Sequence, residues 1–307
     1  MLKKIIFMGT PLFAVPILKS LYQNGYPISV VYTQPPKKSR RGMGFNTTPV
    51  QKMCETLNIE FRTPAYLKNN KDEYEYLKKI DADIAIVVAY GQILPKEVLG
   101  MTKKGFINIH GSLLPKFRGP APIQRSIMNL DKQTGISIMK IVEKLDSGPV
   151  CSSYPLNILE NENFESLSER LSILAAEKIL DDIEAIFENK AIFKSQDDTK
   201  ATYANKILKS EGKINWSDES NNIIGKINAL YPNSFFIFKG ERYKILRAEK
   251  SNKIGEPGHL LSDQFEIGCK GGSIKVLEIQ REGKRPQKIS EFLLGTKIKK
   301  GSNLKDA

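Results

Sequence analysis

Asn108, His110 and Asp146 are three side chains in this sequence whose types and spacing could do chemistry together. Asn108 and His110 end the apolar run FINIH, and Asp146 follows a second apolar run, ISIMKIV. Because alternate side chains of a strand point to the same face, the Asn108 amide and the His110 imidazole share one side. A hydrogen-bond donor, a proton acceptor and an orienting carboxylate suit an acyl transfer whose nucleophile comes from the substrate.

Each of the three side chains also has a simpler interpretation. His110, one of only two histidines, can be a buried strand-end residue with satisfied hydrogen bonds. Asn108 can be satisfied by the main chain, and the Asp146 carboxylate can cap the amides of a turn. The case for chemistry therefore depends on the elements that would bring the three side chains together.

The first half of the chain alternates apolar runs with helical segments. Apolar runs without polar alternation, separated by helices, predict an α/β fold with a Rossmann-like, mostly parallel sheet covered by helices on both faces. Ligands bind beyond the carboxyl ends of such strands, where the three side chains lie. The expected strands are KKIIFM, PISVVYT, IEFRTP, DIAIVVAY, FINIH and TGISIMKIV, and the expected helices span residues 13–24, 49–57, 72–79, 122–129 and 164–188.

The pattern changes after a polar segment that we interpret as a linker, residues 189–205. One helix, at residues 221–230, precedes the short strands SFFIF, RYKILRAE, HLLS, FEIGC and SIKVLEIQ. Close-set strands with glycine-rich turns are typical of a small OB-like β-barrel. The sequence therefore predicts a catalytic domain at residues 1–188, the linker, and an OB-like domain at residues 206–307.

The charge is strongly basic, and the excess is concentrated in the second predicted domain. The 307 residues contain 47 Lys/Arg and 34 Asp/Glu, a net charge of +13. From Lys206 onward there are 20 Lys/Arg and 12 Asp/Glu, a net charge of +8. This excess indicates either a polyanionic partner, such as a nucleic acid, or a lysine-rich solvated surface.

Several classes of site are absent from the sequence. Three well-separated cysteines, Cys54, Cys151 and Cys269, form no metal-ligand pair, so we expect no metal and a reducing cytoplasm. No apolar run approaches the ~20 residues of a membrane span, so we expect no membrane association. Neither GxxxxGK[ST] nor GxGxxG occurs, which disfavours a nucleotide triphosphate or dinucleotide site.

The order of the motifs resembles that of the methionyl-tRNA formyltransferases, a family among the enzymes that use 10-formyltetrahydrofolate. The segments that carry the resemblance are IIFMGTPLFAVPIL, VYTQPPKKSRRG, VVAYGQILP, INIHGSLLPKFRGPAPIQRSI, DSGP, ATYANKILKSEGKINW and EGKRPQKISEFLLG. The resemblance implies transfer of a formyl group from 10-formyltetrahydrofolate to the α-amino group of methionine on initiator methionyl-tRNA, which releases tetrahydrofolate. We expect a cytoplasmic monomer.

The resemblance also assigns roles to residues. It implies that Asn108 donates a hydrogen bond to the developing oxyanion, and that His110, aligned by Asp146, assists proton transfer. It implies folate contacts from Ser112, Leu113, Leu114, Pro115, Ile93 and Leu94. It implies tRNA contacts from Arg41, with Arg40 as the alternative, from Lys38, and from the basic C-terminal domain. Two other functions remain open: formyl transfer to a small amine such as an amino-sugar nucleotide, and a folate- or RNA-binding module without catalysis.

Overall fold

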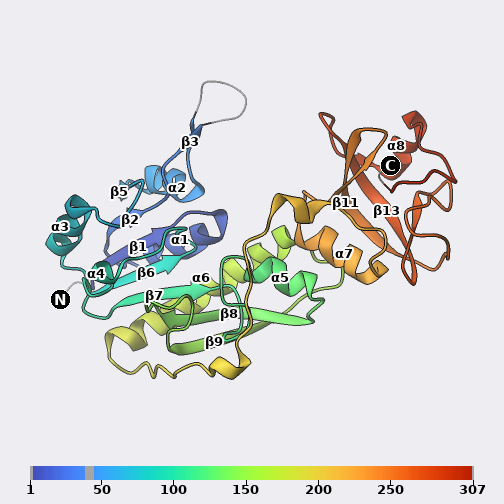
Figure 1. The fold of residues 1–307 in the computed structure, drawn as a ribbon. Coiled ribbons are helices and arrows are strands. Elements are labelled where there is room, and N and C mark those ends of the chain that lie inside the picture. Colours follow the sequence, from blue (N-terminus) through green and yellow to red (C-terminus); the bar gives the residue numbers. More distant parts are fainter. Residues whose placement is uncertain (1–2, 39–44, 306–307) are drawn as a thin grey trace. The chain divides into compact units, whose positions relative to one another are not determined.

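The computed structural model describes residues 3–38 and 45–305. The chain forms two compact units, which are shown in Figure 1. The first comprises Met1–Pro122, Thr134–Leu156 and Ser168–Ala204, and the second comprises Ile123–Gln133, Asn157–Leu167 and Asn205–Ala307. The chain therefore crosses between the units several times before the second unit becomes continuous at residue 205.

A seven-stranded sheet with the order β5-β2-β1-β6-β7-β8-β9 forms the centre of the first unit. The first five strands in that order pair in parallel, and β7 pairs with β8 in antiparallel fashion. A separate two-stranded ladder joins β3 and β4. The strands are β1 (Ile5–Gly9), β2 (Ile28–Tyr32), β3 (Lys37–Lys38), β4 (Phe45–Asn46), β5 (Phe61–Arg62), β6 (Ile84–Val88), β7 (Phe106–His110), β8 (Gln133–Lys140) and β9 (Val150–Asn157).

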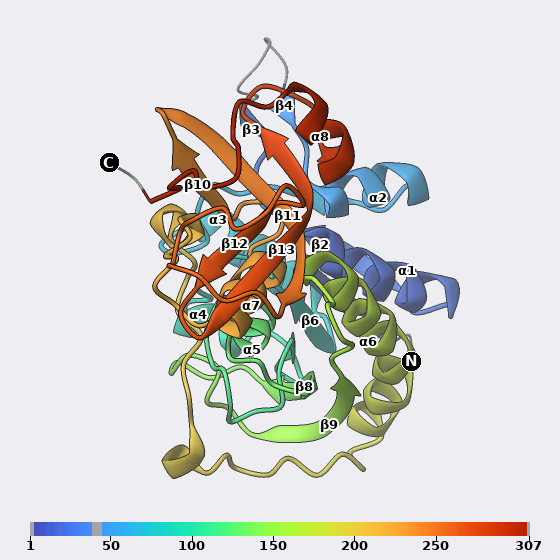
Figure 2. The same ribbon diagram turned by 90° about the vertical axis from the view of Figure 1, so that its right-hand side faces the viewer.

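Helices cover both faces of this sheet, with α1 and α6 on one side in Figure 2. Ser20 of α1 donates a hydrogen bond to the carbonyl oxygen of Ala176 in α6 at 2.7 Å. On the opposite face, Leu77 of α3 and Val98 of α4 belong to one buried cluster with sheet residues such as Met8. The helices of this unit are α1 (Val15–Gln23), α2 (Pro49–Leu57), α3 (Lys71–Ile80), α4 (Lys96–Leu99) and most of α6 (Phe164–Phe187), with short 3₁₀ turns η1 (Leu12–Ala14) and η2 (Asp198–Lys200). The helix α5 (Pro122–Met128) belongs to the second unit from Ile123 onward.

Local sequence signals explain where the helix α2 begins and ends. The Thr48 side chain accepts a hydrogen bond from the Gln51 amide, and Pro49 occupies the first turn, where a missing N–H costs nothing. Asn58 ends the helix in the left-handed conformation with φ 53°, which asparagine tolerates better than most residues. The observed bounds confirm the helix predicted at residues 49–57.

A partly buried ion pair holds α3 against the edge of the sheet. Arg62 of β5 donates two hydrogen bonds to Glu73 of α3, both at 2.8 Å, and Tyr32 of β2 donates a third at 2.7 Å. Burial opposes ionisation of the carboxyl, but these donors outweigh it and lower the pKa of Glu73.

The second unit has a curved antiparallel sheet with the order β10-β11-β13-β12, with β14 paired to β13. Its core includes an aromatic series in which Phe236 stacks on Tyr243 at 5.3 Å between ring centroids. Arg125 of α5 forms a bidentate ion pair with Glu211, which lies in the same unit. The elements are η3 (Lys209–Gly212), α7 (Ser220–Ala229), β10 (Phe235–Phe238), β11 (Glu241–Ser251), β12 (Glu266–Cys269), β13 (Gly272–Arg281), β14 (Gln287–Lys288) and α8 (Ile289–Gly295).

The predicted fold class, a mostly parallel α/β sheet followed by an OB-like β domain, is confirmed. Two local predictions were incomplete. The strand expected at HLLS forms only isolated bridges, at His259 and Leu260, and the fifth strand is β14 instead. The strand β9 was not expected, because its sequence VCSSYPLN is polar and contains a proline.

The segment that we expected to be a linker makes defined contacts with the first unit before residue 205. Lys194 pairs with Val150 in an antiparallel bridge, and Tyr203 pairs with Arg118 in a parallel bridge. The Arg118 amide donates to the Thr202 carbonyl oxygen at 2.8 Å, and the Ala204 amide donates to the Arg118 carbonyl oxygen at 2.7 Å. Within the described residues, no helix is long and apolar enough to cross a membrane.

Candidate active site

The structure brings Asn108, His110 and Asp146 together at the carboxyl end of β7. Asn108 Nδ2 lies 3.5 Å from Asp146 Oδ1, and His110 Nδ1 lies 3.7 Å from Asp146 Oδ2. Asn108 is aligned with Val87 of β6 on one side and Met139 of β8 on the other. The register of the sheet therefore fixes the amide and the imidazole beside one carboxylate.

The His110 ring is buried, with only 6% of its surface exposed. Its Nε2 lies 2.9 Å from the carbonyl oxygen of Phe117. Because a carbonyl oxygen only accepts hydrogen bonds, Nε2 carries the hydrogen in this arrangement. Nδ1 is then the ring nitrogen that faces Asp146 and can take up or release a proton.

Asp146 is held in an uncommon backbone conformation, with φ 45°. Its Oδ2 accepts a hydrogen bond from the Gly119 amide at 2.8 Å. Gly119 itself has φ 118°, and a Cβ there would lie 2.8 Å from the Ala204 carbonyl oxygen. Glycine is therefore needed at position 119 for the main chain to approach both Asp146 and Ala204.

A buried arginine connects the loops around the carboxylate. The Arg118 side chain is completely buried and donates from Nη2 to Asp198 Oδ1 at 2.7 Å. Asp198 Oδ2 also accepts from Lys144 Nζ at 2.8 Å. The hydrogen bonds from Lys144 and Arg118 lower the pKa of Asp198, so this link persists at neutral pH.

The segment from Ser112 to Pro115 forms a tight loop directly after β7. Ser112 is fully buried and its hydroxyl donates to the Lys116 carbonyl oxygen at 2.6 Å, while the Leu114 amide donates to Ser137 Oγ at 3.0 Å. The Ser112 hydroxyl therefore shapes the loop. Leu113, Leu114 and Pro115 are half-buried, so a ligand can still reach them.

Ile93 and Leu94 follow β6, the strand beside β7. Ile93 is 88% exposed, whereas Leu94 packs against the buried cluster that contains Met8 and Val87. An exposed isoleucine at the carboxyl edge of a parallel sheet offers apolar surface to a ligand. That Ile93, Leu94 and the segment 112–115 contact folate stays a prediction.

The basic residues predicted to contact tRNA lie in or next to the β3–β4 ladder. Lys38 in β3 pairs through its main chain with Phe45 in β4. Arg40 and Arg41 lie outside the described residues, as does the side chain of Lys38. Among the residues that are described, no group of three or more His, Cys, Asp or Glu side chains is placed to hold a metal ion.

Sequence reasoning missed Phe117, Gly119 and Arg118 as parts of the site. Phe117 and Gly119 contribute main-chain atoms, a carbonyl oxygen and an amide, which every residue type carries. Residue types therefore give no signal for them. An arginine between Phe117 and Gly119 in a loop gives only a weak signal, because most loop arginines are solvated.

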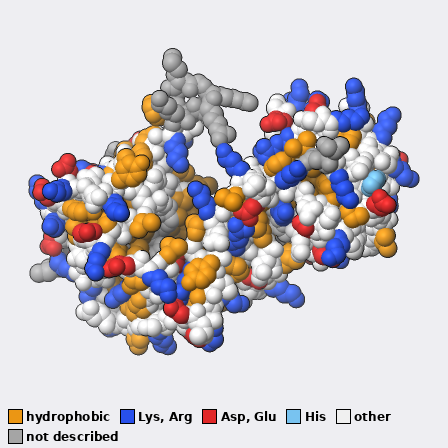
Figure 3. Space-filling view, viewed as in Figure 1, with side chains coloured by type: hydrophobic (Ala, Val, Ile, Leu, Met, Phe, Trp, Pro, Cys, Tyr) orange, Lys and Arg blue, Asp and Glu red, His pale blue; other side chains and the backbone are white. Residues whose placement is uncertain are grey.

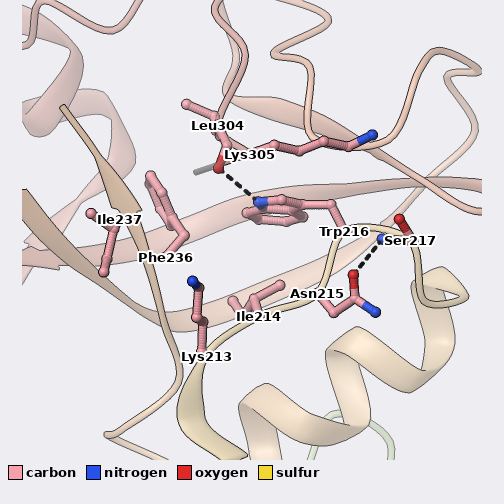
Figure 4. A pocket seen from close by; sticks show the side chains of 9 residues that line it. All are labelled: Lys213, Ile214, Asn215, Trp216, Ser217, Phe236, Ile237, Leu304 and Lys305. Carbon is pink, nitrogen blue, oxygen red and sulfur yellow. Dashed lines mark hydrogen bonds between the residues drawn. The ribbon is translucent and has the colours of Figure 1, made fainter. Parts of the chain in front are cut away.

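Two pockets lie among the described residues of the second unit, and neither is lined by a predicted catalytic or folate residue. The smaller, about 280 Å³, lies around Trp216, whose Nε1 donates to the Leu304 carbonyl oxygen at 3.1 Å (Figure 4). The larger, about 890 Å³, is lined by Tyr243 and Phe292 and by five cationic side chains. These are Lys239, Arg281, Lys284, Arg285 and Lys297. Figure 3 shows several Lys and Arg side chains on the visible face of this unit.

Two family models match the chain and together cover most of it. Residues 3–183 match the model described as formyl transferase, and residues 206–297 match the model described as formyl transferase, C-terminal domain. The first match contains all three residues of the candidate catalytic set.

Relatives of known name and structure extend over nearly the whole chain. A methionyl-tRNA formyltransferase from Pelagibacter ubique is 63% identical over 99% of this chain and 99% of its own length. An N-formyltransferase from Helicobacter canadensis, solved with folinic acid and dTDP-3-aminofucose, has a TM-score of 0.67 and 19% identity, covering 92% of this chain and 100% of its own. HypX from Aquifex aeolicus, solved with tetrahydrofolic acid, has a TM-score of 0.66 and 15% identity; the match covers 98% of this chain and 49% of HypX.

Proposed function

The chain belongs to the formyl transferase family, and we propose that it transfers the formyl group of 10-formyltetrahydrofolate to the α-amino group of methionine on initiator methionyl-tRNA. The observation that carries this proposal is the 63% identity to a methionyl-tRNA formyltransferase over 99% of both chains. The product is N-formylmethionyl-tRNA, which serves translation initiation.

The residues at the sheet edge fit such a formyl donor. Ile93 offers exposed apolar surface, and the Asn108 amide makes only one long hydrogen bond, at 3.5 Å, with the part of the chain that is described. One Asn108 N–H is therefore available to a ligand. 10-Formyltetrahydrofolate supplies the formyl group, whose carbonyl oxygen gains negative charge when an amine adds to its carbon.

Each of the three side chains then has a role that follows from its position. Asn108 donates a hydrogen bond to the oxygen on which negative charge develops, a contribution typically worth about 10²–10³ in rate. His110, through Nδ1, accepts the proton that the attacking amine loses and returns it to the departing folate nitrogen. Asp146 holds the imidazole in place, because its Oδ2 lies 3.7 Å from His110 Nδ1.

The second unit supports the choice of a tRNA substrate. From residue 206 onward the net charge is +8. Five cations and two carboxylates, Glu241 and Glu291, line the pocket beside Phe292, which leaves an excess of positive charge there. Phosphates neutralised by such cations release counterions, which gives sequence-independent affinity for nucleic acid. We propose that this unit, together with Arg41 or Arg40 and Lys38, holds the acceptor arm of the tRNA.

The proposal also includes the organisation of the protein. We propose a catalytic domain at residues 1–188, a connecting segment at 189–205 and a tRNA-binding domain at 206–307. We further propose that the enzyme acts as a monomer in the cytoplasm. Light scattering coupled to size-exclusion chromatography tests the monomer, because a dimer would have about twice the mass of a single 34.6 kDa chain.

One substrate panel tests the function directly. The purified protein is given 10-formyltetrahydrofolate with charged initiator tRNA, charged elongator tRNA, free methionine or an amino-sugar nucleotide such as dTDP-3-aminofucose. Formylation of the charged initiator tRNA in preference to the others supports the proposal. Preferential formylation of the sugar nucleotide would identify a small-amine enzyme, and binding of folate and tRNA without any product would identify a non-catalytic module.

A further inference from the structure

Gln196, a glutamine outside the candidate catalytic set, contacts the main chain at two positions in the loop that contains Asp146. Its Nε2 donates to the carbonyl oxygen of Asp146 at 2.9 Å and to that of Gly148 at 2.7 Å. Its Oε1 accepts from Arg118 Nε at 3.0 Å. Because carbonyl oxygens only accept and an arginine only donates, these partners fix which end of the amide is which.

The two loops joined by Gln196 carry the partners of the His110 ring. One loop contains Phe117, whose carbonyl oxygen lies 2.9 Å from His110 Nε2, followed directly by Arg118. The other contains Asp146, whose carboxylate faces His110 Nδ1 at 3.7 Å. A single side chain therefore connects the segments that contact opposite sides of the imidazole.

The conformation of Asp146 requires such support. A φ of 45° places it in the left-handed region, which a residue with a side chain keeps only when its surroundings determine it. The carboxylate is held by the Gly119 amide at 2.8 Å, and the Asp146 carbonyl oxygen is held by Gln196. Without the second contact the peptide after Asp146 can rotate and carry the carboxylate away from His110.

We propose that Gln196 is a positioning residue for formyl transfer, because its amide sets the Asp146 carboxylate relative to the His110 ring. The inference builds on the proposed roles of His110 and Asp146. The three hydrogen bonds of the Gln196 amide go to Arg118 and to the main chain of Asp146 and Gly148, so its removal should lower the rate of the chemical step and leave substrate binding nearly unchanged.

Two substitutions separate the contacts of Gln196. Gln196→Met has a similar length and makes none of the three hydrogen bonds. Gln196→Glu keeps an acceptor for Arg118 but loses both donors to the Asp146 and Gly148 carbonyl oxygens. Gln133→Glu is the control, because Gln133 lies at the start of β8, is exposed and donates only to Asn157 Oδ1 in the described part of the chain.

Steady-state kinetics well below the melting temperature give the first measurement. Both Gln196 variants should lose about 10- to 100-fold in kcat, with KM for each substrate within about threefold of wild type. The control variant Gln133→Glu should have the same kcat and KM as the wild-type enzyme. The proposal would be overturned if both folded variants kept a kcat within twofold of wild type. It would also be overturned if the substitutions raised KM and left kcat unchanged. A wild-type kcat in Gln196→Glu, with a low kcat in Gln196→Met, would assign the loss to the contact with Arg118. This result would also overturn the proposal.

The ring-proton NMR signals of the two histidines give a second measurement that needs no turnover. Both variants should move the His110 signals and leave those of His259, in the second unit, unchanged. Unmoved His110 signals in a folded variant would contradict the positioning role. If the wild-type protein formylates no substrate, the proposed function fails while this measurement still decides the link from Gln196 to His110. If Gln196→Met does not fold, Gln196→Glu carries both measurements.

Discussion

Gly148→Ala is a small substitution that should damage the active site severely. A Cβ at Gly148 would lie 1.8 Å from the Lys140 carbonyl oxygen, whereas real Cβ atoms stay at least 3.0 Å from such an atom. The loop and strand β8 must therefore separate by the difference, about 1.2 Å. Gly148 lies two residues after Asp146, and the adjacent Pro149 carbonyl oxygen accepts from the Lys140 amide at 2.9 Å.

The expected loss follows from this displacement. A misplacement of about 1 Å in a catalytic group can cost about 10² in rate, so kcat/KM for formyl transfer should fall by about that factor. Overpacking of this kind should also lower the free energy of unfolding by about 1–3 kcal/mol. We would measure kcat/KM with charged initiator tRNA, and stability by urea denaturation followed by circular dichroism.

Gly100→Ala is the matched control for the Gly148 substitution. Gly100 follows α4, and a Cβ there would meet no atom within 4 Å. This variant should keep wild-type activity, and its stability should change little. A folded Gly148→Ala enzyme with the kcat/KM of Gly100→Ala would refute the reasoning, because it would mean that the Asp146 loop can move without effect on transfer.

Further predictions concern the proposed oxyanion donor, the proposed tRNA contacts and a structural ion pair. Asn108→Ala should lower kcat by about 10²–10³ while tRNA affinity stays constant; unchanged turnover in a kinetic assay would remove the donor role. Arg41→Ala should raise KM for charged tRNA or lower kcat, and an effect seen only in Arg40→Ala would assign the contact to Arg40. Log affinity for tRNA should fall steeply between about 50 and 200 mM salt in filter binding, whereas a flat profile would favour a small-amine substrate. Glu211→Gln should cost about 1–3 kcal/mol of unfolding free energy at neutral pH. Hydrogen bonds from Arg125 lower the pKa of Glu211 from its usual 4.5, so this stabilisation is present above pH 4.5 and is lost as the pH falls through the lowered pKa of the folded state. A stability difference between variant and wild type that is as large at pH 3 as at neutral pH would contradict the role of the ion pair.

The sequence determined the class of fold and the residue types at the centre of the site. Apolar runs such as DIAIVVAY lack polar alternation because both faces of a parallel strand are buried, and this pattern depends only on local composition. The spacing of Asn108 and His110 likewise follows from the two-residue period of a strand. The terminal signals of α2, Thr48 and Pro49, lie next to each other in the chain, so its start could be predicted.

The tertiary structure alone decided how the proposed catalytic groups are held. The carbonyl oxygen of Phe117, the amide of Gly119 and the carbonyl oxygen of Asp146 are main-chain atoms, and their partners lie 7, 27 and 50 residues away in sequence. Gln196 lies in a polar segment with the composition of a linker, 50 residues beyond Asp146. Residue types report what a side chain can do, but the partner of a hydrogen bond depends on which distant segments the fold brings within about 3 Å. For that reason the sequence pointed to the amide, the imidazole and the carboxylate, and only the folded chain showed the glutamine that joins their loops.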